Sequence, residues 1–397
     1  MPTAEVIEKK NSSKRCDGSK RVKAAIVTNI IPPYRRALFE AIGREVELTV
    51  IISAAMEQHR LWKAWDESEE TNFKTKILKG LRLKHREGFF CAQPALFRQL
   101  SEQSPDIIIN CGFNLNSLFG AIYAKKHKKK ALLWSEATVH SESKYSGLRK
   151  LYRKILIHLN DGFIAPGTEA REYLLSLGAE SKKCFLAVDA IEDIRESDFF
   201  EELKEQAAAK RKGFGQTVLI YSGQLIKRKG IDLLLKAYKE VCDKYDTTLL
   251  IMGNGPREDE LKDYVKENGL KGVQFLGFKD EKEKWIYYLA SDVFILPTRE
   301  DVWGLVVNEA MLCGLPVICS KYSGAARDLV IDGENGRGVQ PEDTESFSQV
   351  IEELLQNRNK REQMGLCSLE IIEKYSIEES AKGFFRAIGF CRSTSRI

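Results

Sequence analysis

The stretch EDVWGLVVNEAMLCGLPVI, residues 300–318, indicates the fold that we expect for this chain. It follows a short apolar segment, DVFILPT at residues 292–298, and leads into another, LPVICS at residues 315–320. Two buried strands joined by a helix are typical of a βαβ unit, in which the strands run parallel. Glu309 stands inside the apolar run of that helix, where a carboxylate is costly unless it is paired or hydrogen-bonded. The stretch therefore predicts a polar ligand along this helix.

Two more carboxylates, Glu300 and Asp301, stand at the start of the same helix. Asp301 and Glu309 are eight residues apart, which predicts a separation of about 12 Å along a helix axis that rises ~1.5 Å per residue. That separation is close to the span from a sugar, across two phosphates, to a ribose. Carboxylates accept hydrogen bonds from sugar hydroxyls, and free backbone N–H groups near Gly304 suit phosphates. The spacing therefore predicts a nucleotide-sugar laid across the helix start.

Strand and helix signals alternate along nearly the whole chain. In the first half, apolar strands are expected at residues 22–29, 46–53, 106–110, 130–136 and 162–167. In the second half, strands are expected at residues 216–223, 247–253, 273–278, 292–298 and 315–320, with helices at about 230–244, 256–268, 282–291 and 303–313. This order predicts an α/β protein with parallel sheets covered by helices.

The length of 397 residues favours two domains, because one hydrophobic core rarely serves so long a chain. We expect a disordered leader at residues 1–20, a first Rossmann-like domain at residues 21–189, a linker at residues 190–215, a second Rossmann-like domain at residues 216–375 and a C-terminal helix at residues 376–397. The amphipathic C-terminal helix is expected to cross back to the first domain. Ligands of such sheets bind outside the carboxyl ends of the strands, so the cleft between the domains is the expected site.

The composition favours a protein of the cytoplasm. No window holds the ~18 consecutive apolar residues that a transmembrane helix needs, and the leader lacks the apolar core of a secretory signal. The nine cysteines are odd in number and most stand in apolar runs. We therefore expect reduced thiols in the core, and neither disulfides nor a metal site.

Positive charge is concentrated in the first half of the chain. Residues 1–189 carry 32 Lys and Arg against 21 Asp and Glu, a balance of +11, so the remaining residues carry −6 to give the net +5. The stretch GLRKLYRKILIHLN, residues 147–160, predicts a helix that buries the face with Leu148, Leu151 and Ile155 and leaves its basic residues in solvent. The alternative is a helix that docks on an anionic membrane surface. Nucleic acid is not an expected partner, because aromatic residues for base stacking are not interleaved with the basic ones.

Four strand-to-helix turns of the second half carry glycines. The first, YSGQLIKRKGID, places Gly223 after a strand and Lys229 just before the next helix. A glycine lets a ligand approach the backbone, a lysine supplies charge, and a helix N-terminus adds its dipole. The turns at residues 252–259, 276–280 and 297–304 repeat the pattern. One such turn is common in any α/β protein, but four in succession predict a phosphorylated ligand.

Three segments of the second half together resemble glycosyltransferase family 4, the group 1 glycosyltransferases of GT-B fold. They are TREDVWGLVVNEAMLCGLPVI (298–318), GQLIKRKGIDLLLKAY (223–238) and GNGP (253–256). In the first half, IPPYRRALFEAIG (31–43) and PDIIINCGFN (105–114) resemble the acceptor-side domain of the same enzymes. The resemblance spans essentially residues 20–390, and it implies two Rossmann-like domains that face a central cleft.

The resemblance implies a retaining, metal-independent hexosyltransferase that needs no cofactor and moves a sugar from a nucleotide-sugar donor to an acceptor hydroxyl. Consistently, the sequence has no Asp-x-Asp triplet such as metal-dependent transferases use. Asp301 and Glu309 match the two acids of the family's E-x7-E motif, which implies contacts to the donor sugar and to the ribose. Lys229 matches the lysine that neutralises the diphosphate. The other donor-side residues implied are Gly223, Gln224, Arg228, Gly253, Gly255, Phe278, Lys279, Glu300, Gly304, Leu305 and Val306.

Three positions depart from the family pattern. Asp301 replaces the usual first Glu of the motif, and Gln224 stands where an arginine commonly pairs with the lysine on the diphosphate. In the first domain, Glu136 replaces the active-site histidine, with His140 as the alternative. These departures leave open whether the site keeps full activity.

The acceptor side is expected to include Tyr34 and Arg35, which stand just after the first strand. The basic first half, read with the resemblance, implies a polysaccharide or lipid-linked acceptor and a cytoplasmic protein that is peripheral on the membrane. Two alternatives remain. One is a nucleotide-sugar-binding protein of the same fold without catalysis, which the departures at Gln224 and Glu136 motivate. The other is a sugar-nucleotide epimerase or a phosphorylase.

Overall fold

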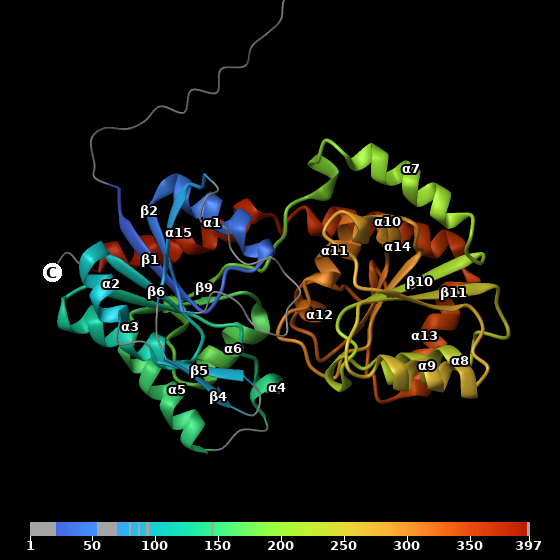
Figure 1. The fold of residues 1–397 in the computed structure, drawn as a ribbon, viewed down its shortest axis with the longest axis horizontal. Coiled ribbons are helices and arrows are strands. Elements are labelled where there is room, and N and C mark those ends of the chain that lie inside the picture. Colours follow the sequence, from blue (N-terminus) through green and yellow to red (C-terminus); the bar gives the residue numbers. More distant parts are fainter. Residues whose placement is uncertain are drawn as a thin grey trace, which may run out of the picture.

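A computed structural model gives the fold of the chain (Figure 1). It describes residues 21–53, 70–78, 81–85, 88–92, 95–143 and 147–394. The leader expected at residues 1–20 lies outside the described residues. The chain forms two α/β domains, each built on a parallel sheet covered by helices, and the predicted fold class is confirmed.

The first domain has a seven-stranded sheet with the order β3-β2-β1-β6-β7-β8-β9. Its strands are β1 (Lys23–Thr28), β2 (Glu47–Ile52), β3 (Phe73–Ile77), β6 (Ile107–Cys111), β7 (Lys130–Trp134), β8 (Gly162–Ala165) and β9 (Cys184–Leu186), with a separate antiparallel hairpin of β4 (Leu81–His85) and β5 (Gly88–Ala92). Its helices are α1 (Pro33–Glu45), α2 (Ala95–Gln103), α3 (Leu115–Lys126), α4 (Val139–Glu142), α5 (Gly147–Leu159), α6 (Thr168–Ser176) and the short η1 (Ser181–Lys183). Ile26 of β1 and Ile109 of β6 have no exposed surface. Such central strands are covered on both faces, which explains their continuous apolar sequences.

The second domain has a six-stranded sheet with the order β12-β11-β10-β13-β14-β15. Its strands are β10 (Thr217–Ser222), β11 (Thr247–Met252), β12 (Val273–Gly277), β13 (Val293–Leu296), β14 (Val317–Ser320) and β15 (Gly336–Val339). Its helices are η3 (Lys227–Lys229), α8 (Ile231–Lys239), α9 (Glu258–Glu267), α10 (Glu283–Leu289), α11 (Val306–Leu312), α12 (Gly324–Leu329), α13 (Thr344–Gln356) and α14 (Arg358–Ile372). The helix predicted at residues 303–313 is α11, which is shorter than expected.

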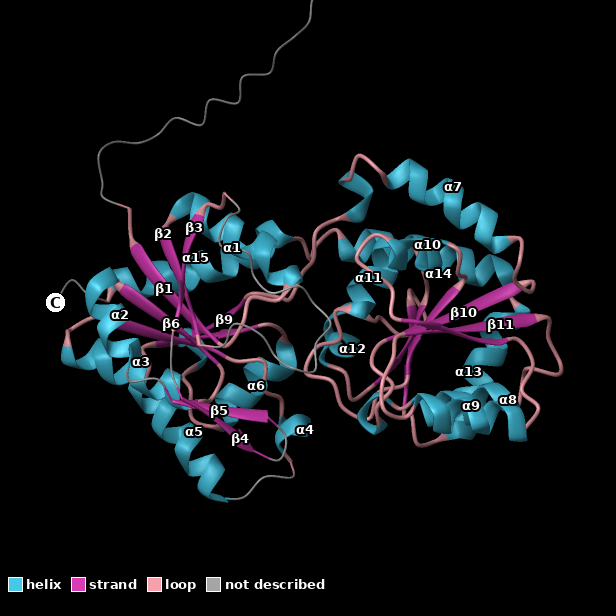
Figure 2. Cartoon of the chain, viewed as in Figure 1, coloured by secondary structure: helices cyan, strands magenta, loops and turns pink. Residues whose placement is uncertain are grey.

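Both sheets reverse their strand order beside their first strand. In the first sheet the chain moves outward from β1 to β3 and then restarts on the other side of β1 at β6; the second sheet repeats this with β10, β12 and β13. The carboxyl ends of β1 and β6, and of β10 and β13, are therefore topological switch points, where ligands of open sheets bind. Figure 2 shows the strands of both sheets running toward the boundary between the domains.

The chain crosses between the domains twice. Residues 190–215, expected as a linker, contain η2 (Ile194–Glu196) and a helix, α7 (Phe200–Arg211), which packs beside α10 on the second domain. The chain returns through α15 (Ile377–Ser393), which contacts α1, β8 and β9 of the first domain. Phe384 of α15 meets the indole of Trp134 with ring centroids 4.9 Å apart. The last helix is therefore part of the first domain's core.

The basic helix α5 faces the opposite way from the prediction. The side chains of Leu148, Leu151 and Ile155 are 79%, 57% and 45% exposed, whereas Arg153 is only 3% exposed. Arg153 forms an ion pair with Glu142 of α4 inside the domain. The predicted burial of the leucine face was wrong, because this internal partner allows the opposite face of the helix to turn inward.

The described part of the chain has no helix that is long and apolar enough to cross a membrane. The cysteines whose state the structure gives are all free thiols: Cys111, Cys184, Cys242, Cys313, Cys319, Cys367 and Cys391. The prediction of reduced cysteines is confirmed for these seven residues.

Candidate active site

The loop after β13 carries the first of the predicted acids. Helix α11 begins at Val306, and Asp301 lies before it, in an isolated bridge with Ser323. The predicted spacing of Asp301 and Glu309 along one helix axis is therefore wrong, because only Glu309 is helical. Gly304 has a φ of +100°, a left-handed conformation that favours glycine and turns the chain toward the helix.

Asp301 forms an ion pair with Lys229 at the end of η3. The two side chains are 10% and 15% exposed, so each charge is neutralised mainly by the other. Gly230 brings their turns together: its φ is +72°, and a Cβ there would lie 2.0 Å from the carbonyl oxygen of Pro297. The fold thus unites the lysine and the first acid that the sequence singled out.

Two hydrogen bonds also join the turns after β10 and β13. Nη1 of Arg228 donates to the carbonyl oxygen of Glu300 at 2.7 Å, and the N–H of Arg299 donates to the carbonyl of Arg228 at 2.8 Å. Arg299 in turn pairs with Asp232 of α8 at 2.7 Å. The guanidinium of Arg228 therefore supports the loop that carries Asp301, and its contact to a diphosphate stays a prediction.

Glu309 has both carboxylate oxygens hydrogen-bonded. Oε1 accepts from Nζ of Lys284 at 2.7 Å, and Oε2 accepts from the hydroxyl of Tyr288 at 2.8 Å. Burial, and then the charge of Glu309, raise the pKa of Tyr288, so the phenol stays protonated and donates. Burial alone disfavours the ammonium of Lys284, but the carboxylates of Glu309 and Glu281 outweigh burial and raise its pKa. Protein side chains alone can thus stabilise this carboxylate within the helix.

A cavity of about 1100 Å³ lies between the domains beside Glu309. The second domain lines it with Glu309, Lys284, Leu305 and Val306, and the first domain contributes Tyr34. Four residues predicted from the sequence therefore share one cavity, and they come from both domains.

The predicted glycines pack one strand-to-helix turn against the next. A Cβ at Gly253 would lie 1.9 Å from the carbonyl oxygen of Gly223, and a Cβ at Gly255 would lie 2.5 Å from the carbonyl oxygen of Leu225. Gln224 follows Gly223 in the same stack. The close approach of these turns is enough to require glycine, so packing explains these glycines without a ligand.

Phe278 and Lys279 follow β12. The ring of Phe278 is 49% exposed. The ammonium of Lys279 donates to Glu283 of α10 at 2.8 Å and lies 5.3 Å from the ring centroid of Tyr287. Helix α10 therefore engages Lys279, and the predicted contact of both residues to a base stays a prediction.

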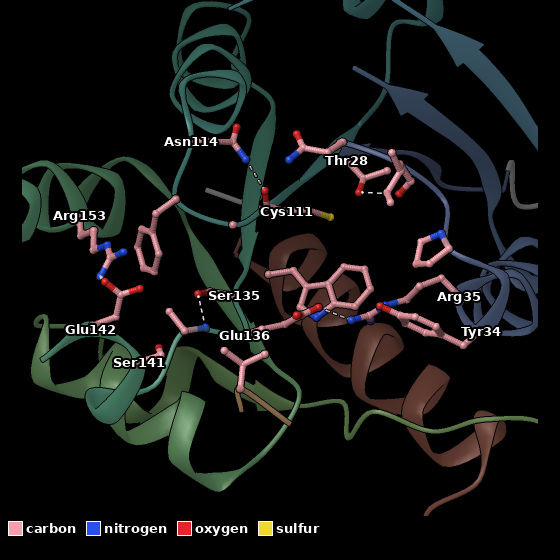
Figure 3. Close-up of a pocket in the computed structure, with 18 of the residues that line it drawn as sticks. Thr28, Tyr34, Arg35, Cys111, Asn114, Ser135, Glu136, Ser141, Glu142 and Arg153 are labelled. Carbon is pink, nitrogen blue, oxygen red and sulfur yellow. Dashed lines mark hydrogen bonds and ion pairs between the residues drawn. The ribbon is translucent and has the colours of Figure 1, made fainter. Parts of the chain in front are cut away.

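A second cavity, of about 450 Å³, opens on the first domain (Figure 3). The first domain lines it with Tyr34, Arg35 and Glu136, and the second domain closes it with Glu300 and Val302. The predicted acceptor residues Tyr34 and Arg35 and the predicted catalytic residue Glu136 thus lie together, next to the loop that carries Asp301.

Arg35 joins two carboxylates at the base of this cavity. Its guanidinium pairs with Glu136 and with Asp189, the latter at 3.1 Å, and lies 4.1 Å from the ring centroid of Trp134. Burial disfavours the charged form of Arg35, but the two carboxylates outweigh burial and raise its pKa. Burial raises the pKa of Asp189 to about 7, although the charge of Arg35 opposes the rise. Asp189 was not predicted from the sequence; its position three residues after β9 is the signal that points to it.

His140 lies at the boundary between the domains. Its Nε2 is 2.8 Å from the carbonyl oxygen of Arg299, and its ring stacks on that of Tyr322 with centroids 4.3 Å apart. Arg299 and Tyr322 belong to the second domain, so His140 makes an interdomain contact. Of the two alternatives that the sequence left open, Glu136 is the one that lines the cavity of Figure 3.

Comparison with known proteins bears on this geometry. Residues 202–366 match the family described as glycosyl transferases group 1. The matched residues include most of the second domain. The GDP-mannose-dependent alpha-(1-6)-phosphatidylinositol monomannoside mannosyltransferase of Mycolicibacterium smegmatis is 30% identical over 184 residues, which are 43% of this chain and 48% of that protein. The capsular polysaccharide biosynthesis glycosyltransferase CapM of Staphylococcus aureus is 30% identical over 151 residues, 37% of this chain and 39% of that protein.

The chain spans about half the length of most curated relatives that it matches. The likeness to solved structures covers more. HepE of Anabaena, solved in complex with UDP, superposes with a TM-score of 0.71 over 95% of this chain and 100% of HepE, at 16% identity. The segment that matches group 1 glycosyl transferases thus lies within a GT-B fold, as predicted, and the assignment to family 4 stays a prediction.

Proposed function

We propose that the protein is a retaining glycosyltransferase of family 4, which moves a sugar from a nucleotide-sugar to an acceptor hydroxyl in glycolipid or polysaccharide assembly. The observation that carries the proposal is the buried Lys229–Asp301 ion pair at the switch point of the second sheet, with Glu309 on the helix that follows. Relatives support a nucleotide-sugar donor, since HepE was solved with UDP and the mycobacterial relative is named for GDP-mannose.

On the donor side, the ammonium of Lys229 is the group that stabilises the diphosphate. An anionic diphosphate competes with Asp301 for this ammonium and, once bound, becomes a better leaving group because its charge is neutralised. Asp301 is then released to accept a hydrogen bond from a hydroxyl of the donor sugar. The backbone N–H of Gly304 adds a donor for phosphate, and Glu309 accepts from the hydroxyls of the ribose.

The transfer breaks the bond between the anomeric carbon and the oxygen of the β-phosphate, and the electron pair leaves with the nucleoside diphosphate. The acceptor oxygen bonds to the anomeric carbon on the face that the leaving group vacates, so the configuration is retained. The proton of the acceptor hydroxyl passes to the departing phosphate oxygen. Lys229 supplies the positive charge that this step needs, and we therefore propose no metal and no cofactor.

On the acceptor side, the hydroxyl that reacts binds in the cavity of Figure 3. Glu136 is 42% exposed there and accepts from an acceptor hydroxyl. The guanidinium of Arg35 holds that carboxylate in place through their ion pair, and the phenol of Tyr34 lines the same wall.

The acceptor is presented by an anionic lipid surface, and the protein is peripheral on the membrane. Helix α5 exposes Leu148, Leu151 and Ile155 in one row, beside the exposed Lys150 and Lys154. The helix carries no acidic residue. An apolar row flanked by lysines fits an interface with anionic headgroups, and the same helix borders the acceptor cavity.

Flotation with phosphatidylglycerol vesicles tests this surface. The protein is expected to float with these vesicles at low salt. The combined variant Leu148→Gln, Leu151→Gln, Ile155→Gln is expected not to float with them. Leu366→Gln is the control, since Leu366 is 63% exposed on α14 of the second domain and should leave flotation unchanged. Equal flotation of the wild-type protein and the triple variant would reject the proposal that α5 is the docking surface.

The donor site is tested by a thermal-shift and hydrolysis screen against UDP-, GDP-, ADP- and dTDP-sugars with EDTA present. One nucleotide is expected to stabilise the protein, with slow release of its diphosphate. Binding without turnover would favour a non-catalytic nucleotide-sugar-binding protein, and conversion of the donor to another sugar without an acceptor would favour an epimerase. No response to any of the four nucleotides would reject the donor site.

A further inference from the structure

A chain of buried hydrogen bonds runs from the donor helix into the first domain. Asn308, the residue before Glu309 on α11, has no exposed surface. Its Nδ2 donates to the backbone carbonyl of Asp189 at 3.0 Å, and its Oδ1 accepts from Nε1 of Trp303 at 3.0 Å. The N–H of Asp189 donates to the carbonyl of Pro166 in the first domain at 3.1 Å. Asn308 is therefore fixed to the point where the chain leaves the first domain.

The same Asp189 also supports the acceptor cavity. Its carboxylate pairs with Arg35 at 3.1 Å, and Arg35 pairs with Glu136, which lines the cavity. Asp189 and Arg35 are 5% and 6% exposed, so water does not replace these contacts readily. We call the path from Asn308 through Asp189 and Arg35 the Asp189 link.

The donor loop is attached to the Asp189 link through Trp303, two residues after Asp301. The indole is 2% exposed, and a Cβ at Gly167 of the first domain would lie 2.5 Å from its ring. The neighbouring buried positions of α11, Val307 among them, are apolar. A buried amide is costly unless it is hydrogen-bonded, so the amide of Asn308 is explained by the two groups that it joins and not by the packing of α11.

We propose that Asn308 and Asp189 are positioning residues, which hold the donor loop at a fixed distance from the carboxylate of Glu136. The inference rests on the proposed glycosyl transfer and states how the donor loop and the acceptor cavity are aligned. Nucleotide binding depends on groups of the second domain, whereas transfer needs both halves together. Loss of the Asp189 link therefore lowers turnover and leaves nucleotide affinity in place.

The variants Asn308→Leu and Asp189→Asn test the inference, with Asn335→Ser as the matched control. Asn335 is also fully buried, but it donates to the carbonyl of Leu329 at 2.9 Å and accepts from the N–H of Ile331 at 2.7 Å, all within the second domain. The probes are the nucleoside diphosphate that stabilises the wild-type protein, for calorimetry, and its sugar, for hydrolysis by water. Both link variants are expected to bind the nucleotide within threefold of wild type and to lose at least tenfold in turnover. The control is expected to melt at a lower temperature with turnover within twofold.

A double-mutant cycle separates positioning from a loss of stability. Asn308→Leu and Glu136→Gln act through one path. The fold-loss of turnover in the double variant is therefore expected to be clearly smaller than the product of the fold-losses in the two single variants. Fold-losses that multiply in the double variant would overturn the inference, and so would an equal loss of turnover in Asn335→Ser.

If no nucleotide binds the wild-type protein, the proposed function fails, but the Asp189 link is still tested by small-angle scattering. The radius of gyration of Asn308→Leu is then expected to exceed that of Asn335→Ser, and equal radii would reject the link.

Discussion

The two domains assemble their charged groups in different ways. In the second domain, Lys229 meets Asp301 because both stand in turns that follow adjacent strands of one sheet. In the first domain, Arg35 draws together Glu136, which is 101 residues away, and Asp189, which is 154 residues away and lies on the crossing between domains. The charged groups of the proposed donor side thus come from one domain, whereas those of the proposed acceptor side depend on how the two domains are joined.

The largest expected effect is on the stability of the first domain. Glu142→Ala leaves Arg153 buried with its main ion partner gone, and the side chains of that pair are 11% and 4% exposed. Breaking a buried pair by removal of one partner costs about 3–5 kcal/mol. Chemical denaturation is expected to show this loss. Glu102→Ala is the control: its pair with Arg98 is exposed, and such pairs contribute at most about 1 kcal/mol. Similar losses in the two variants would contradict the burial of Arg153.

The next effect concerns the donor side. Glu309→Gln keeps the size of the side chain but removes the charge that Lys284 and Tyr288 hold in place. If Glu309 binds the ribose as proposed, two charge-assisted hydrogen bonds are lost, each worth about 1.5–3 kcal/mol, so donor turnover is expected to fall by about 100-fold or more. Tyr288→Phe keeps the carboxylate and removes one neutral hydrogen-bond donor, so turnover of the nucleotide-sugar is expected to fall about tenfold. Steady-state hydrolysis of the nucleotide-sugar measures both, and a larger loss in Tyr288→Phe would refute the role of the Glu309 carboxylate.

The donor side was the easier half to predict. Switch-point turns lie at strand ends, and a strand end can be located from its apolar run, so Lys229 and Asp301 were both named from the sequence, although the ion pair between them was not predicted. The start of α11 was not predicted, because the left-handed turn at Gly304 and the bridge from Asp301 to Ser323 depend on contacts outside the segment. The glycines were found for an incomplete reason, since Gly253 is already required by the turn beside it.

The acceptor side was harder to predict because its groups are far apart in sequence. Tyr34, Arg35 and Glu136 were named separately, but nothing in the chain around Arg35 indicates that Asp189 is its partner. The inward face of α5 was also misjudged. A helical period defines two opposite faces of a helix, and only a tertiary contact, here that of Glu142 with Arg153, decides which face is buried.

The pH dependence of stability tests the crossing between the domains. The folded-state pKa of Asp189 is raised to about 7 by burial, whereas an unfolded Asp titrates at about 3.9. Between these values the folded state binds more protons, so this group makes stability fall as pH rises, on the order of 1 kcal/mol per pH unit, and its contribution is lost above the folded pKa. Melting temperatures from pH 4 to pH 8 are expected to have a flatter profile in Asp189→Asn. Identical slopes in the two proteins would exclude a titrating Asp189.

The smallest expected effect decides which face of α5 the first domain uses. Leu148 is 79% exposed, so Leu148→Ala is expected to change the free energy of unfolding by no more than about 0.5 kcal/mol. Leu156, on the other face, has no exposed surface, and Leu156→Ala is expected to cost about 2–5 kcal/mol. The face predicted from the sequence would give the reverse order under chemical denaturation. A near-zero cost at Leu148 would show that this side chain contributes little to the folded domain. Weaker vesicle flotation of the same variant would then assign Leu148 to the membrane surface, whereas unchanged flotation would leave it an exposed side chain without a role in docking.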